Sequence, residues 1–489
     1  MKSGSLRLSA AAERTLIIIV AVLLLVPCFW QPHIIAGDLS SHVYNAWLAD
    51  QIENNKLLGQ GLSLANPVTN VLTDRIMETL LTRVAPSATE RIVVGAAIEI
   101  FFWGSFFFVK AVSGKRRWIV APSLAMITYG LMFHAGFLNF YVSTGLSLWL
   151  MALLWHPRLP WCWLAIPCTL LALMAHPLPP AWALAALLYV QGARLVPERH
   201  RHAVFLTAVC LMILFRTTLP FGPTDGSLGD ILGLQGMLGL TGVGQMWVYG
   251  VKYLFVVAGI LIVWFVLLLE RLDRGTFVED PLVQIWGLSM VAYMLLPNVI
   301  HFPRYDAPLE FVQYRLSLFI AILFCAMVAQ SLHGRGLTRA SILLAAAFFI
   351  MVYLDAKSLN HVEAELARLV SSLPPGTPVV TALRDSGSVR LNGLVHVGSA
   401  ACLGRCWDYG NYEPASTHFR VRISGPSKII AGNTRTVAEI ERGRHTVSAQ
   451  EAPLYSVCPV KGPDPQFELR KLSAGETTCL VRIPAVNYF

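Results

Sequence analysis

Long apolar runs alternate with short polar connections over the first 354 residues of the chain. A helix needs about 20 mostly apolar residues to cross the roughly 30 Å core of a bilayer. About eleven runs approach that length, and the short loops between them imply antiparallel neighbours. The pattern therefore predicts a polytopic α-helical membrane domain with spans near 16–30, 92–112, 118–133, 136–155, 161–176, 179–195, 203–219, 247–269, 281–299, 315–332 and 339–354.

The first apolar run begins like a secretory signal peptide, because Lys2, Arg7 and Arg14 precede it. A cleaved signal would end in small residues, whereas residues 26–29 read VPCF. We therefore expect this segment to be retained as the first membrane anchor.

The pattern changes after residue 354, where polar residues and turns rich in Pro and Gly replace the apolar runs. Residues 358–373 carry apolar positions at helical spacing, and 378–383 and 419–423 read as strands. We expect residues 1–354 to form the transmembrane domain, with a first outer loop at 31–91. Residues 355–489 then form a small C-terminal α/β or α+β domain.

Composition supports the membrane interpretation. With 55% hydrophobic and 14% charged residues and a mean hydropathy of +0.57, the chain is too apolar for an ordinary soluble domain. The same composition excludes intrinsic disorder, a collagen-like fibre and a small disulfide scaffold. The net charge of +9 gives no reason to expect a nucleic-acid partner, because cytoplasmic loops of membrane proteins collect Lys and Arg.

Basic residues are concentrated in alternate loops, as the positive-inside rule requires for a cytoplasmic N-terminus. The loops assigned to the inside contain Lys110, Lys115, Arg116, Arg117, Arg158, Arg194, Arg199, Arg201, Arg271, Arg274, Arg335 and Arg339. An odd number of spans then places the C-terminal domain outside. Lys252, near the outer end of a span, is expected to extend toward the headgroups.

The nine cysteines divide by region. Cys28, Cys162, Cys168, Cys210 and Cys325 lie in or beside spans, whereas the C-terminal domain holds Cys402, Cys406, Cys458 and Cys479. An even set in an oxidising compartment favours two disulfides, most simply 402–406 and 458–479. A zinc site is the alternative, although the C-x-x-x-C pair has no second close pair.

The first outer loop carries the most informative polar pattern. At about 100° per residue, Asp38, His42, Asn45 and Ala49 share one stripe of a helix, beside an apolar stripe. This predicts a helix at the membrane surface with its polar stripe turned toward a cavity. In the alternative interpretation Asp38 only caps the helix, since Asp is a favoured N-cap residue.

Other short motifs accompany this loop. They are GFLNFY at 136–141, AHP at 175–177, LP at 296–297 followed by Arg304 and QYRL at 313–316, and NYEP at 411–414 with FRVR at 419–422. Together with Asp38 after the first span, they resemble the GT-C superfamily of integral-membrane glycosyltransferases, which includes protein O-mannosyltransferases and lipid A aminoarabinose transferases. The resemblance covers most of the membrane region. Leu39 stands where many members have a second acid, Glu.

The resemblance implies an inverting transfer of a sugar from a polyprenyl-phosphate carrier to an extracytoplasmic acceptor, in a bacterial inner membrane. Asp38 matches the catalytic acid and would serve as the general base. Arg304, Arg315 and His301 would bind the donor phosphate, because guanidinium groups match phosphate oxygens. Candidate substrate or metal contacts are His42, Asn45, His134, Asn139, Tyr141, His176 and Glu310. A divalent metal is compatible with the histidines and Asp38, but no cofactor is certain.

Each candidate also has a structural interpretation. Arg315 could lie at the lipid interface, Arg304 in solvent, and Glu310 could pair with Arg315 or replace the missing second acid.

Two other function classes stay open: a transporter or flippase of lipid-linked glycans, and a non-catalytic envelope scaffold. The spans carry few mid-bilayer charges, and the sequence contains no phosphate-binding loop, zinc helix or nucleophile elbow.

Overall fold

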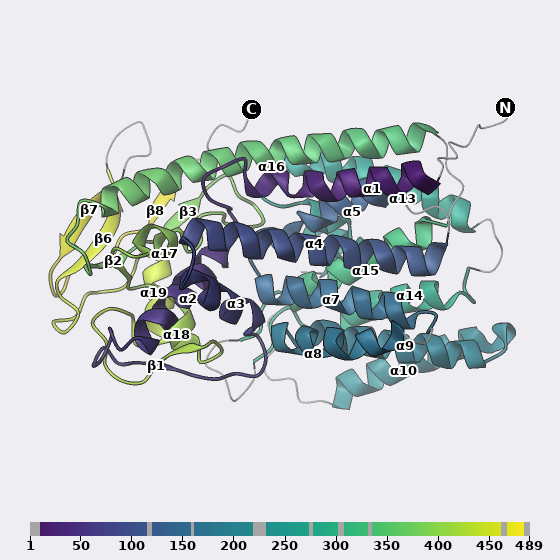
Figure 1. Ribbon diagram of the computed structural model, residues 1–489, viewed down its shortest axis with the longest axis horizontal. Helices are drawn as coiled ribbons and strands as arrows, with labels where there is room; N and C mark the ends of the chain where they lie inside the picture. Colours follow the sequence, from purple (N-terminus) through teal and green to yellow (C-terminus); the bar gives the residue numbers. More distant parts are fainter. Residues whose placement is uncertain are drawn as a thin grey trace.

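The structure is a computed structural model, and it describes residues 10–114, 120–157, 161–218, 231–272, 277–301, 308–330, 335–460 and 467–483. Apolar helices lie side by side along the long axis, while the strands and several short helices gather at one end (Figure 1). Five of the described helical segments are long and apolar enough to cross a membrane: Ala11–Cys28, Pro86–Ser113, Glu198–Thr218, Val251–Leu272 and Gly336–Val370. The chain is consistent with a helical membrane protein.

The described helices of the bundle follow the predicted runs closely. They are α1 (Ala10–Leu24), η1 (Val26–Cys28), α4 (Pro86–Ser113), α5 (Ala121–Thr128), α6 (Leu131–His134), α7 (Leu138–Leu154), η3 (Trp161–Leu164), α8 (Ala165–Ala175), α9 (Leu178–Leu195), η4 (Glu198–His200), α10 (Arg201–Thr218), α12 (Leu234–Thr241), η5 (Val243–Met246), η6 (Val251–Tyr253), α13 (Leu254–Leu272), α14 (Pro281–Leu295), α15 (Val312–Val328) and α16 (Arg335–Val370). The predicted span 118–133 is instead broken between α5 and α6. At the break, a Cβ on Gly130 would lie 2.8 Å from the carbonyl oxygen of Gln245, so this close approach requires glycine.

Helix α16 continues well past its expected end. It runs 36 residues without interruption, so the domain boundary expected after residue 354 falls inside it. In Figure 1 it extends from the bundle to the strands. Asp355, fully buried in this helix, contacts Lys252 and accepts a hydrogen bond from the Tyr253 hydroxyl at 2.7 Å. Lys252 therefore pairs with a buried carboxylate and does not extend toward headgroups.

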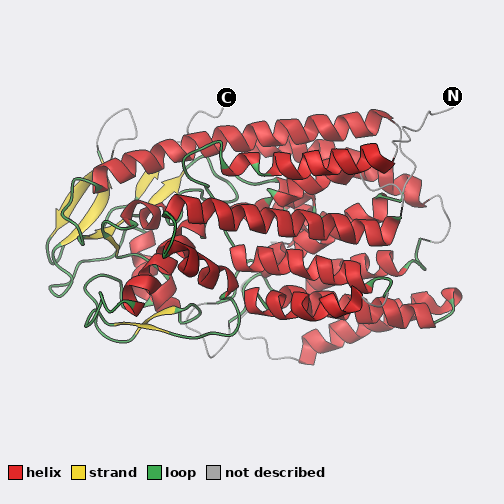
Figure 2. Cartoon of the chain, in the orientation of Figure 1, coloured by secondary structure: helices red, strands yellow, loops and turns green. Residues whose placement is uncertain are grey.

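The C-terminal residues combine short helices with strands, which are confined to one end of the molecule (Figure 2). The elements are α17 (Val397–Cys402), α18 (Glu413–Ser416), α19 (Thr434–Glu441), β2 (Pro378–Val380), β3 (Leu383–Asp385), β4 (Trp407–Asp408), β5 (Val421–Ile423), β6 (Leu454–Pro459), β7 (Phe467–Leu472) and β8 (Val481–Ile483). A mixed sheet has the order β4-β2-β6-β7, and β3 pairs with β8 in parallel. The predicted strand 378–383 is thus two strands. Disulfides join Cys402 to Cys406 and Cys458 to Cys479, in the pairing that the sequence favours.

The first outer loop is integrated with the C-terminal residues. It contains α2 (Leu39–Glu53), β1 (Leu62–Leu64) and α3 (Leu72–Leu81). Strand β1 pairs antiparallel with β5, and α2 packs on α17. Most of α2 is buried, including His42, Tyr44 and Asn45. Helix α2 is therefore an internal helix, because the C-terminal residues cover it, and its position at the membrane surface stays a prediction.

Candidate active site between the bundle and the C-terminal residues

A cavity of about 590 Å³ lies where the bundle, the first outer loop and the C-terminal residues meet. Its size is in the range of small-molecule sites, which are about 300–1,000 Å³. Seven predicted site residues line it, although they come from four separate segments of the chain: Asp38, His42, His134, Asn139, His176, Glu310 and Arg315. Asn45 and Tyr141 are outside its lining. His301 is exposed and also outside the lining, and Arg304 lies outside the described residues.

The backbone around Asp38 is fixed by two glycines. The Asp38 amide donates to the carbonyl oxygen of Ala135 at 3.1 Å. A Cβ on Gly136 would lie 2.3 Å from that same amide nitrogen, and Gly136 has a φ of +80°. A Cβ on Gly37 would lie 2.3 Å from the Ala135 oxygen. Gly136, the first residue of the GFLNFY motif, therefore packs directly against the backbone of Asp38.

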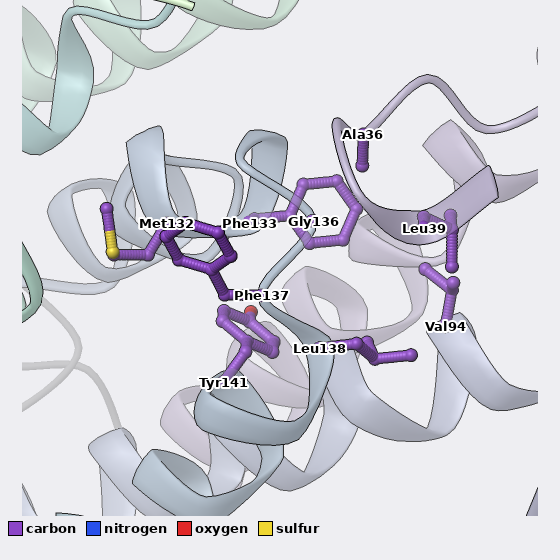
Figure 3. Close-up of a pocket in the computed structure, with 9 residues that line it drawn as sticks. All are labelled: Ala36, Leu39, Val94, Met132, Phe133, Gly136, Phe137, Leu138 and Tyr141. Atoms are coloured by element: carbon purple, nitrogen blue, oxygen red, sulfur yellow. The ribbon is translucent and has the colours of Figure 1, made fainter. Parts of the chain in front are cut away.

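Behind this contact is a small apolar pocket of about 10 Å³ (Figure 3). Ala36, Leu39 and Val94 lie on one side of it, and the rest of its lining is Met132, Phe133, Gly136, Phe137, Leu138 and Tyr141. Asp38 is the N-cap residue of α2, but its side chain makes no capping hydrogen bond. The interpretation of Asp38 as a simple helix cap is therefore wrong.

The Asp38 carboxylate instead faces a histidine from the C-terminal residues. Oδ1 of Asp38 lies 3.4 Å from Nε2 of His396, whose ring stacks on Tyr412 with centroids 4.7 Å apart. Burial alone would raise the pKa of Asp38. His396, the positive charge of His42 and the Tyr412 hydroxyl outweigh burial, and the pKa lies below its usual value. Asp38 is therefore ionised at neutral pH, as a general base must be.

A second charged cluster lies one helical turn further along α2. Nδ1 of His42 is 3.1 Å from Oδ1 of Asp74 and 3.4 Å from Oε1 of Glu413. Burial opposes the charged form, but the two carboxylates raise the pKa of His42 to about 10. His42 is therefore a buried cation shared by two acids.

The remaining polar residue of the α2 stripe serves a structural purpose. Asn45 donates to Oδ1 of Asn411 at 3.1 Å, and Asn411 donates back to Oδ1 of Asn45 at 2.8 Å. Ser41 donates to Oε1 of Glu413 at 2.9 Å. The polar stripe thus faces the NYEP motif as well as the cavity, and Asn45 fastens α2 to the C-terminal residues.

Arg315 forms the cationic part of the cavity wall. Its Nη1 lies 3.3 Å from Nε2 of His176, and its Nε donates to the backbone oxygen of Glu310 at 3.3 Å. The guanidinium carbon is 4.4 Å from the ring centroid of Phe137 and 5.0 Å from that of Phe140. Within the described residues, no carboxylate lies within 4.0 Å of Arg315, so Glu310 does not pair with it. The buried guanidinium is therefore available to an anion in the cavity.

The other predicted contacts mainly position neighbouring segments. His134 Nδ1 lies 3.2 Å from the Ile35 oxygen and 3.0 Å from the Tyr249 hydroxyl. Asn139 accepts from the Thr73 amide at 3.0 Å and donates to Oδ2 of Asp74 at 3.1 Å, so it holds the start of α3. Tyr141 donates to the Thr128 oxygen at 2.9 Å, away from the cavity.

The three histidines considered as metal ligands have separate partners. His42 lies between acids, His134 contacts Tyr249, and His176 contacts Arg315. Within the part of the chain that the structure describes, no group of three or more His, Cys, Asp or Glu side chains is arranged so that it could hold a metal ion. The geometry described here thus gives no support to the possible metal site.

Four residues at the site were missed by sequence reasoning: Asp74, His396, Tyr412 and Glu413. The NYEP motif at 411–414 is a usable signal for Tyr412 and Glu413, although the motif alone assigns neither residue a role. Asp74 and His396 have no local signature, because their importance arises only from contacts with distant segments. No family model, curated protein or solved structure matches this chain.

Proposed function

We propose that this chain is an inverting membrane glycosyltransferase of the GT-C type, which moves a sugar from a polyprenyl-phosphate carrier to an extracytoplasmic acceptor. The observation that carries the proposal is the single cavity that holds an ionised carboxylate, Asp38, and a buried arginine without a carboxylate partner among the described residues, Arg315. An inverting displacement requires these two groups: a base for the acceptor and a cation for the departing phosphate.

In the proposed reaction, Asp38 takes the proton of the acceptor hydroxyl as its oxygen bonds to the anomeric carbon. The bond between that carbon and the phosphate oxygen breaks on the opposite face, which inverts the configuration. The electron pair leaves with the phosphate, where Arg315 stabilises the charge. Asp38 and Arg315 line the same cavity, as two groups that face one bound molecule must. Arg304 and His301 stay predictions as further phosphate contacts.

The proposal includes a membrane arrangement. We infer about eleven spans, a cytoplasmic N-terminus in a bacterial inner membrane, and C-terminal residues outside. The alternation of basic loops supports this orientation. It places the cavity at the outer ends of the helices, where a lipid-linked donor would enter from the bilayer and an acceptor from the outside.

The decisive test is Asp38→Asn in purified, reconstituted protein. We expect at least a hundredfold loss of transfer from a panel of undecaprenyl-phosphate sugars, because the amide cannot act as a base. Asp50→Asn on the same helix is the matched control, since Asp50 does not line the cavity. Wild-type transfer rates in Asp38→Asn would remove Asp38 from the mechanism, and transfer lost in both variants would indicate a general defect of α2.

A further inference from the structure

His396 reaches the site from a loop that is fixed to the bundle and to β3. The amides of Val389 and Arg390 donate to the Tyr249 oxygen of the bundle at 3.1 and 3.2 Å. Within the loop, Asn392 accepts from the Asp385 amide at 3.1 Å and donates to the Leu383 oxygen at 2.9 Å. The loop is therefore held to the bundle and to β3 before the chain reaches His396.

The backbone at His396 adopts a conformation that side chains rarely take. Its φ is +60° and its ψ +13°, in the left-handed region. For a residue other than glycine this region is strained, whereas glycine would adopt it freely. An imidazole in this position is thus present at an energetic cost, which its contacts must offset.

The charged groups around the ring explain what the imidazole does there. Asp38 faces it from the start of α2, Asp408 from β4 and Glu441 from the end of α19, while Tyr412 stacks on it. These three carboxylates favour the protonated ring and, although burial opposes it, they raise the pKa of His396 above its usual value. Asp38 itself also faces His42, Tyr412 and Arg315.

We propose that His396 is a positioning residue for Asp38: its imidazolium ring engages Oδ1 and holds the carboxylate charged and oriented toward the acceptor hydroxyl. The C-terminal residues thereby complete the catalytic site as well as covering it. This inference rests on the proposed function for its catalytic meaning, but the pairing of the two side chains can be measured without any turnover.

The turnover-independent test is infrared titration of Asp38. Difference spectra against Asp38→Asn isolate the carboxylic acid band of Asp38, and its midpoint is followed with pH in wild-type protein and in His396→Asn. Asparagine tolerates the left-handed backbone and carries no charge. We expect the midpoint to rise by about one pH unit or more in His396→Asn, since an opposite charge beside a carboxyl lowers its pKa by that order.

His396→Gly is a second variant that keeps the backbone conformation without strain, so folding does not limit the test. It should give the same upward shift as His396→Asn. His361→Gln, on an exposed part of α16, is the matched control and should leave the midpoint unchanged. An unchanged midpoint in both His396 variants would overturn the inference, because the ring would then be only a structural contact.

The same variants are then compared in sugar transfer. The acid limb of kcat/KM should move upward with the infrared midpoint in His396→Asn, while the KM for the lipid donor stays near that of the wild type. If the midpoint shifts but the protein transfers no sugar, the pairing of His396 with Asp38 is supported and the proposed function is rejected. Transfer that depends on Asp38 but keeps its pH profile in His396→Asn would keep the function and reject the role of His396.

Discussion

At the residue scale, the closeness of Gly136 to the Asp38 amide makes the position of the proposed general base sensitive to one added methyl group. A Cβ at Gly136 would overlap the amide nitrogen and the Ala36 oxygen, at 2.3 and 2.7 Å. The backbone at Asp38 would have to move, and a displacement of about 1 Å near the reacting groups can cost on the order of a hundredfold in rate. The role that we assign to the GFLNFY motif is therefore to fix the position of the Asp38 backbone.

We expect Gly136→Ala to lower sugar transfer by about tenfold to a hundredfold while the protein still inserts and folds. Transfer from the lipid-linked donor, normalised to folded protein, measures this. Gly192→Ala is the control, since a Cβ there meets no atom within 4 Å and the rate should match that of the wild type. A Gly136→Ala protein with full activity would show that Asp38 does not need its present position.

The buried cluster around His42 predicts how stability depends on pH. In the folded protein, the carboxylates of Asp74 and Glu413 raise the pKa of His42 to about 10, from an ordinary value near 6.5. Burial also raises the pKa of Glu413 above its usual value. Both groups therefore bind protons more tightly when folded. Their stabilisation is fully present at low pH, and the part from His42 is lost as the pH rises from 6.5 through about 10.

We expect the Tm of the wild-type protein in detergent to fall across this interval, and the slope to flatten in a His42→Gln, Glu413→Gln double variant. The double variant removes the titrating cation together with one of its acids. His361→Gln, whose side chain is 77% exposed, should keep the wild-type slope. If the double variant shows the full wild-type slope, the cluster is not the source of the pH dependence.

At the scale of elements, the short pairing of β1 with β5 is reinforced by one arginine. Arg420, buried just before β5, donates to both carboxylate oxygens of Glu78 in α3 at 2.9 Å and also contacts Glu53 in α2. It further donates to Oδ1 of Asn66 at 3.1 Å. These contacts tie the first outer loop to the C-terminal residues, so they hold both walls of the cavity together.

Arg420→Ala should therefore destabilise this interface strongly. Removing one partner of a buried ion pair typically costs about 3–5 kcal/mol, because the remaining charge stays buried. We expect a Tm lower by several degrees and faster proteolysis of the 54–70 segment. Arg422→Ala, in β5 itself, is the control and should change the Tm little, since among the described residues the Arg422 side chain donates only to the Phe419 oxygen. Equal effects of the two variants would argue against a specific role for Arg420.

The elements that could be predicted from sequence are those with a local signal. The apolar runs that became α4, α7, α9 and α15 needed only their length and composition. The break at Gly130 and the burial of α2 depend on contacts with Gln245 and with the C-terminal residues, which no window of sequence contains. The pairing of β1 with β5 joins segments more than 350 residues apart, so its register has no local signal either.

At the scale of the whole molecule, the site exists because two distant parts of the chain close on the same cavity. Sequence motifs were enough to select Asp38, Arg315 and several histidines as candidates. They did not predict that these side chains would line one cavity. His396 and Asp74 became visible only after folding. A sequence motif identifies reactive side chains within one segment. The groups that shift the pKa of those side chains come from distant segments, at no fixed spacing.

The orientation of the molecule in the membrane is the remaining prediction at this scale. The free cysteines of the described residues, Cys28, Cys162, Cys168, Cys210 and Cys325, are first replaced by serine. One reporter cysteine is then introduced by Ser386→Cys. Ser386 directly follows β3, which lies at the end of the molecule where the strands gather (Figure 1). Glu198→Cys lies between α9 and α10, in a loop rich in arginine, where its side chain is 74% exposed.

We expect a membrane-impermeant maleimide to label Ser386→Cys in intact cells with an opened outer envelope, and to label Glu198→Cys only after the inner membrane is permeabilised. The reason is that Lys and Arg are retained on the cytoplasmic side during insertion. Labelling of Glu198→Cys alone in intact cells would show that the orientation is the reverse of the one proposed. The cavity would then face the cytoplasm, and a polyprenyl-phosphate sugar presented on the outer leaflet would not reach Asp38.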